Sequence, residues 1–177
     1  MIIRPNSPGG MIRVGALWTW ERLSKFGKVL DVQKAFNTVP NQGLNHILDV
    51  AFHAATQIDP WYCLLWSSDY TPLAADTYAV PGYTEFQAYN EANRVEFKES
   101  AAAAGVLSNA GSRAIFTMTV ESMIYGSAMV GGGGAASTKA DTAGGGTLVS
   151  SVRMGVPQIY HIGEVIRVTA SFTMVSA

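Results

Sequence analysis

The chain has little charge and almost no cysteine. Of its 177 residues, only 14% are charged, the formal net charge is −1, and the one cysteine is Cys63. A single cysteine excludes a disulfide within the chain and a zinc site built from cysteines. A net charge near zero argues against nucleic acid as the principal ligand, because phosphate binding depends on clustered lysine and arginine. Cys63 lies in the apolar run WYCLLW, which indicates a buried, unreactive thiol.

Long apolar runs and targeting signals are also lacking. No stretch approaches the roughly eighteen apolar residues that cross a bilayer as a helix. The N-terminus shows no charged-then-apolar signal followed by a cleavage site. We therefore expect a chain that is made in a cytosol and does not bind a membrane.

Sequence patterns of catalysis and cofactor binding are missing as well. There is no Gly-Xaa-Ser-Xaa-Gly nucleophile motif, and the glycine runs lack both the lysine of a phosphate-binding loop and the third glycine of a dinucleotide site. His46, Asp49 and His53 would share one face of a helix, but zinc-binding helices usually place their ligands four residues apart and no further ligand lies nearby. We predict no catalytic residues, no metal site and no cofactor, and therefore no enzyme.

The sequence does contain one clear amphipathic helix. Apolar residues recur at three- and four-residue spacing and predict a helix over 42–56 with its apolar stripe against a sheet: Leu44, Ile47, Leu48, Ala51, Phe52 and Ala55. Pro40 and Asn41 lie just upstream, where they would start such a helix.

Strand patterns dominate the remainder of the chain. Residues 61–66 are apolar on both faces, which predicts a central buried strand. Residues 113–120 and 164–175 alternate between apolar and polar side chains, as strands with one buried face do. Six to eight strands with regularly spaced turns predict a mainly β fold, an antiparallel β-sandwich of jelly-roll-like type. The lack of repeated βα alternation disfavours a parallel sheet.

The first 38 residues are predicted to be an extended, basic N-terminal arm on a body formed by residues 39–177. Residues 1–36 carry six of the twelve basic residues and two of the thirteen acidic ones. Such asymmetry is typical of a segment that contacts an acidic partner, although a solvated terminus without a partner is the alternative. Two tryptophans in the arm would serve as anchors on a partner or on the body of the same chain. The predicted contact residues are Arg4, Arg13, Trp18, Trp20, Arg22, Lys25 and Lys28.

Two glycine runs bracket a polar segment at residues 131–146. Glycine and small polar side chains cannot build a core, so the segment is predicted to be an exposed, mobile flap unless a neighbour holds it. The residues that mark the flap are Gly131, Gly134, Lys139 and Gly144.

Several motifs resemble a group of small virion proteins encoded in the structural gene block of tailed bacteriophages. They include VPNQGLNHILDVAF at 39–52, YTPLAADT at 70–77, TEFQAYNEANR at 84–94 and RAIFTM at 113–118. The resemblance implies a capsid decoration or cement protein that binds the outside of the expanded head. Its expected partners are the major capsid protein and further copies of itself, as dimers or trimers on the lattice. Its expected location is the capsid exterior of a virion assembled in the host cytoplasm.

Two alternatives remain open from the sequence. The chain could instead be a tail, baseplate, fibre or head-to-tail adaptor subunit, in which case its copy number per particle would be small. It could also be a glycan-binding virion module whose Tyr78, Tyr83 and Tyr89 stack on sugars.

Overall fold

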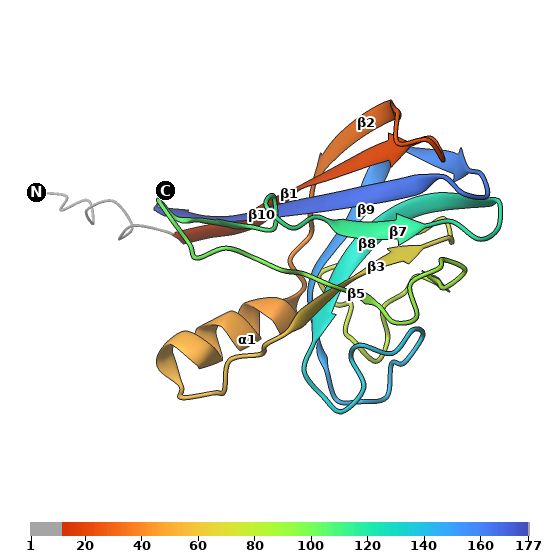
Figure 1. Cartoon of the computed structure of the whole chain (residues 1–177). Helices are drawn as coiled ribbons and strands as arrows, with labels where there is room; N and C mark the ends of the chain where they lie inside the picture. The colour runs from red at the N-terminus through yellow and green to blue at the C-terminus, as the bar shows by residue number, and fades with distance from the viewer. Residues whose placement is uncertain (1–11, 177) are drawn as a thin grey trace, which may run out of the picture.

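The computed structural model describes residues 12–176, which form two five-stranded antiparallel sheets (Figure 1). The first sheet has the order β2-β1-β10, with two short strands pairing along β10: β1 (Ile12–Leu23), β2 (Val29–Phe36), β6 (Val106–Ser108), β7 (Ala114–Thr117) and β10 (Val165–Ser176). The second sheet has the order β4-β3-β8-β9, with β5 also pairing with β3: β3 (Trp61–Trp66), β4 (Glu85–Phe86), β5 (Val95–Glu96), β8 (Ser122–Gly131) and β9 (Thr147–Tyr160). The mainly β, antiparallel character agrees with the prediction.

The main core lies between the two sheets and contains side chains from both of them. Trp18 and Trp20 of β1 are buried there, and their indole N–H groups donate to the hydroxyls of Ser150 in β9 at 3.0 Å and Ser127 in β8 at 2.7 Å. Buried indole N–H groups usually find such partners. Ser150 and Ser127 therefore complete hydrogen bonds that join the sheets.

The prediction of an extended N-terminal arm is wrong for residues 12–36. This segment forms the β1–β2 hairpin, and β1 pairs along its whole length with β10. Its alternating residues Ala16, Trp18 and Trp20 face the core, so burial of two indole rings stabilises a strand where the basic charge indicated an arm. Arg4, the remaining part of the predicted arm contact, lies outside the described residues.

The helix α1 (Asn41–Phe52) follows the hairpin and is shorter than the predicted span 42–56. It ends at His53, and Ala54 adopts a left-handed backbone conformation with φ of 54°. Gly43 sits so close to β9 that a Cβ would lie 2.7 Å from the Cα of Val149, which explains the glycine. Ile47 packs against the core, but Leu48 and Phe52 are exposed. Half of the predicted apolar stripe, Leu48, Ala51 and Phe52, is therefore exposed and does not lie against a sheet, contrary to the prediction.

A second apolar cluster covers the outer face of the second sheet. Leu64 and Trp66 point to this side, whereas Cys63 and Leu65 point into the main core. The loop between β3 and β4 folds over the sheet, and its Tyr83 stacks on Trp66 with ring centroids 4.6 Å apart. β3 is thus buried on both faces and paired on both edges, as its sequence predicted. In the part of the chain described here, no helix has the length and apolarity needed to span a membrane.

Candidate functional site

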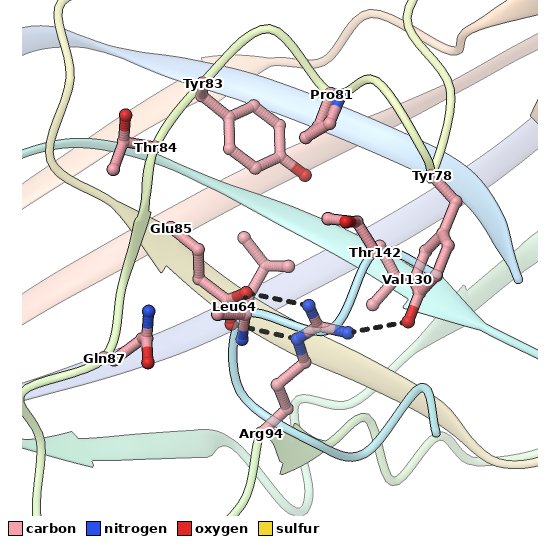
Figure 2. Close-up of a pocket in the computed structure, with 11 residues that line it drawn as sticks. Leu64, Tyr78, Pro81, Tyr83, Thr84, Glu85, Gln87, Arg94, Val130 and Thr142 are labelled. Atoms are coloured by element: carbon pink, nitrogen blue, oxygen red, sulfur yellow. Dashed lines mark hydrogen bonds and ion pairs between the residues drawn. The ribbon is translucent and has the colours of Figure 1, made fainter. Parts of the chain in front are cut away.

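A pocket of about 150 Å³ with polar and apolar lining residues lies on the outer side of the second sheet, among the loops that cover it (Figure 2). Its central feature is an ion pair between Arg94 and Glu85, whose side chains are almost fully buried. The guanidinium donates from Nε to Oε1 at 2.9 Å and from Nη2 to Oε2 at 2.7 Å, a bidentate geometry. Figure 2 shows a third bond, from Arg94 to the hydroxyl of Tyr78.

Every donor of the Arg94 guanidinium has a partner within the chain. Besides Glu85 and Tyr78, it donates to the backbone carbonyls of Ala136 and Asp141, both at 2.9 Å. Arginine has five N–H groups, and these contacts use all of them. Burial alone would lower the pKa of Arg94, but hydrogen bonding and the charge of Glu85 outweigh it and raise this pKa above the ordinary value. Arg94 is therefore permanently charged and has no free donor for a ligand. We call the ion pair of Arg94 and Glu85 the clasp.

The clasp holds the predicted flap in place. Oε2 of Glu85 accepts the backbone N–H of Ala140 at 2.7 Å, and the ammonium of Lys139 donates to the carbonyls of Gln87 and Tyr89. The pKa of Lys139 is lowered, because its partial burial disfavours the charged form. The flap is thus held by a neighbouring part of its own chain, which is the exception that the prediction allowed.

The glycines of the flap serve its tight packing. Gly131 is buried at the end of β8, and the N–H of Gly134 donates to the carbonyl of Gly144 at 3.0 Å. At Gly133, φ is 66° and a Cβ would lie 1.8 Å from the carbonyl oxygen of Gly144. Only glycine fits there, so this run closes the loop and does not form a phosphate site.

The three tyrosines of the glycan hypothesis lie in the interior. Tyr78, Tyr83 and Tyr89 are all buried, and burial raises the pKa of each phenol. Stacking on a sugar requires an exposed ring face. This conformation presents none at these positions, so the structure removes the basis on which the hypothesis was made.

Cys63 and the histidines of α1 are placed apart from one another. Cys63 is fully buried, and burial raises the pKa of its thiol to about 12. His46 packs edge-on against Trp61 with ring centroids 5.7 Å apart, and His53 lies 3.7 Å from Asp49 on the exposed side of the helix. Among residues 12–176, no group of three or more His, Cys, Asp or Glu side chains is arranged to hold a metal ion.

A larger, apolar groove opens at the end of the molecule where β1 begins and β10 ends. It has a volume of about 330 Å³ and lies between the two sheets, beside α1 and the segment after β5. Its apolar lining comes mainly from Val14, Ile47, Trp61, Leu107, Phe172 and Met174. Two polar side chains, Gln57 and Glu99, complete the lining, and both are exposed.

The outward side of the edge strand β2 is also apolar. Leu30, Val32, Lys34 and Phe36 alternate along the strand and are exposed, with 81% of Phe36 accessible to solvent. We call these four residues the β2 surface. A concentration of large exposed apolar side chains on one strand is typical of an interaction surface.

The predicted contact residues of the hairpin are dispersed. Arg22 forms a two-bonded ion pair with Glu164, at 3.0 Å and 2.9 Å, and lies over the ring of Tyr160. Arg13 is exposed near the start of β1, whereas Lys25 and Lys28 are exposed in the turn at the other end of the strand. Trp18 and Trp20 were predicted to be anchors on a partner or on the body of the same chain. Both lie in the core, so they anchor β1 to the body, and their prediction as partner contacts is wrong.

Sequence reasoning missed the Arg94–Glu85 clasp and the β2 surface. No sequence pattern marks Glu85 as buried, and Arg94 holds it in the interior. The alternation of Leu30, Val32 and Phe36 was a readable strand signal that the basic charge of the segment concealed. The chain matches no protein-family model and no curated protein.

Proposed function

We propose that the chain is a structural virion protein that binds the outer surface of a capsid and cements neighbouring capsid subunits. The observation that carries this proposal is the β2 surface, which places three large apolar side chains on an exposed edge strand. Cement proteins act by burying such area across the seams between subunits, and repetition over the lattice strengthens a modest affinity per site. The resemblance of the sequence motifs to those of phage virion proteins suggests the capsid as the partner.

Rigid support behind the β2 surface favours this function. β2 pairs with β1, whose tryptophans are fixed in the core, and the side chain of Gln33 bonds to both backbone groups of Val156 in β9. Asp31 accepts a hydrogen bond from Gln158 of the same strand at 2.8 Å. A surface that is already ordered loses little conformational entropy when it binds.

The residues proposed to contact the capsid are therefore those of the β2 surface together with the exposed Arg13, Lys25 and Lys28. The cations lie at the two ends of β1 and would meet acidic groups of the capsid at the rim of the interface, where charges chiefly affect the association rate. The finer fold assignment, a β-sandwich of jelly-roll-like type, belongs to the same proposal, because such modules are the usual scaffold of the proteins that the motifs resemble.

A binding experiment with capsids tests the proposal. Expanded capsids that lack the protein would be prepared from the virus that encodes it, mixed with the purified chain and sedimented. We expect the wild-type chain to sediment with the capsids and the V32S/F36S variant to bind about tenfold more weakly or worse, as loss of a central apolar contact does. V80S, which changes an exposed valine on the loop between β3 and β4, is the matched control and should bind like wild type. Equal binding of V32S/F36S would contradict the proposal.

A further inference from the structure

Phe26 stands at the tip of the β1–β2 hairpin with 86% of its side chain exposed. Its turn is rigidly built, because the Ser24 hydroxyl accepts the N–H groups of Phe26 and Lys28, and the Ser24 carbonyl accepts that of Gly27. Gly27 has φ of 81°, the left-handed conformation that closes such turns. The ordered backbone of the turn thus presents the aromatic ring to solvent.

A second apolar side chain lies at the same end of the molecule. Ile162, in the turn between β9 and β10, is 68% exposed, and its neighbour Gly163 lies beside Lys25 of the hairpin turn. We call Phe26 and Ile162 the knob. Lys25 and Lys28 flank it, and the Lys25 ammonium lies 5.1 Å from the centre of the Phe26 ring.

The apolar groove lies at the opposite end of the same strands. Val14 of β1 and Met174 of β10 line the groove, and they are register partners. The other ends of these strands, Leu23 and Val165, are register partners beside the hairpin turn. A strand rises about 3.3 Å per residue, so the groove and the knob are separated by about 30 Å. Figure 1 shows α1 and the start of β1 at one side of the molecule and the end of β1 at the other.

We propose that the knob of one copy inserts into the apolar groove of a second copy, so that the chains associate head to tail. The groove volume of about 330 Å³ lies at the lower end of the roughly 300–1,000 Å³ of small-molecule sites, which suits one or two side chains. The charges also match, because the knob is flanked by two lysines and the groove carries the exposed Glu99. Every copy offers both halves of this contact, a heterologous arrangement that repeats into a ring or a filament.

The apolar contacts of this self-association, Phe26 and the groove, are distinct from the β2 surface proposed to bind the capsid, whereas Lys25 and Lys28 belong to both proposed interfaces. Sedimentation velocity of the full chain over a range of concentrations gives the first test. We expect the wild type to form larger species as concentration rises, and F26S and M174K each to weaken this association by about tenfold or more. The matched control F36S, which also removes an exposed phenylalanine, should associate like wild type while binding capsids poorly.

Charge reversal gives a second, independent test at exposed positions that folding tolerates. E99K alone and K25E/K28E alone should each weaken association, and the combined variant should recover it. Raised salt should also weaken the wild-type contact, because exposed charges are screened.

Crosslinking identifies what occupies the groove. A photoreactive benzoylphenylalanine at position 26 should crosslink between chains to Leu107 or Met174. A chain that stays monomeric at all concentrations, association that survives F26S, or crosslinks from position 26 to another surface would overturn the proposal. So would a groove filled by residues 1–11 of its own chain or by a co-purified apolar molecule seen in native mass spectrometry.

Discussion

Trp18 and Ser150 are joined by a hydrogen bond that crosses the interior, from the indole Nε1 to the serine Oγ at 3.0 Å. The same hydroxyl accepts a second bond from the Asn37 side-chain amide at 2.8 Å. The Ser150 hydroxyl therefore accepts hydrogen bonds from both Trp18 and Asn37, two residues of the segment that was predicted to be an arm.

Replacing this serine should destabilise the protein. S150A leaves the Trp18 indole N–H buried without an acceptor, and we expect a loss of about 1–3 kcal/mol in the free energy of unfolding. S151A is the matched control, because the adjacent Ser151 is equally buried but its hydroxyl has no hydrogen-bond partner. Chemical denaturation should place S151A within about 0.5 kcal/mol of wild type or above it. Equal losses in the two variants would contradict this account of the inter-sheet bonds.

Removing the buried cation should destabilise the protein more strongly. R94Q leaves the Glu85 carboxylate in the interior without its charge partner, and we expect a cost of about 3–5 kcal/mol. Because Arg94 also holds the carbonyls of Ala136 and Asp141, limited proteolysis should cut R94Q faster within residues 132–146. D69N removes the partner of Arg153 at a mostly exposed position and should cost less than about 1 kcal/mol. A stable, protease-resistant R94Q would show that the clasp does not hold the loop.

The close packing at Gly126 predicts a strong effect of a single methyl group. A Cβ there would lie 2.2 Å from the carbonyl oxygen of Val152 and 2.3 Å from the Trp66 ring. We expect G126A to lose about 1–3 kcal/mol or more through overpacking. G155A in β9 meets nothing within 4 Å, so it should be neutral or slightly stabilising. Thermal unfolding monitored by circular dichroism compares the two variants, and an unaffected G126A would contradict the described packing.

The burial of Cys63 should make the stability of the protein depend on pH in the alkaline range. Burial raises the pKa of the Cys63 thiol from the ordinary value of 9.0 to about 12, so at alkaline pH the folded state retains a proton that the unfolded chain releases. The stability that this group contributes is complete below about pH 9 and falls as pH rises toward 12. Iodoacetamide at pH 9 should therefore modify Cys63 in urea but not in buffer. The C63A variant should lose less stability between these pH values, and rapid labelling of the folded chain would contradict the burial.

The strands with one clear pattern could be predicted from the sequence. Residues 61–66 are apolar on both faces because both faces of β3 are covered, and the alternation of 164–175 matches β10 within a residue at each end. The pattern of apolar residues reflects which side chains are buried, so it was sufficient to predict these two strands. The helix was predicted correctly, but its predicted end at residue 56 lies beyond the observed end at Phe52. The left-handed conformation of Ala54 ends the helix, and nothing in the alanine side chain indicates that conformation.

The hairpin depended on partners distant in the sequence, whereas the clasp depended on how two nearby segments fold over the second sheet. Trp18 and Trp20 resembled exposed anchors until Ser150 and Ser127 supplied acceptors for their N–H groups from more than a hundred residues away. The ion pair of Glu85 in β4 with Arg94, nine residues later, could not be predicted because no periodic pattern indicates that these two side chains face each other. Charge was a misleading guide here, since six basic residues marked a segment whose alternate residues form the core.

The number and position of copies in a purified particle test the central claim most directly. Quantitative mass spectrometry of washed virions, combined with cryo-electron microscopy of the head, gives both. The account predicts a copy number that matches the capsid lattice, with the β2 surface against the outer face of the major capsid protein. A small number of copies confined to the tail, or washed virions that lack the protein, would contradict it.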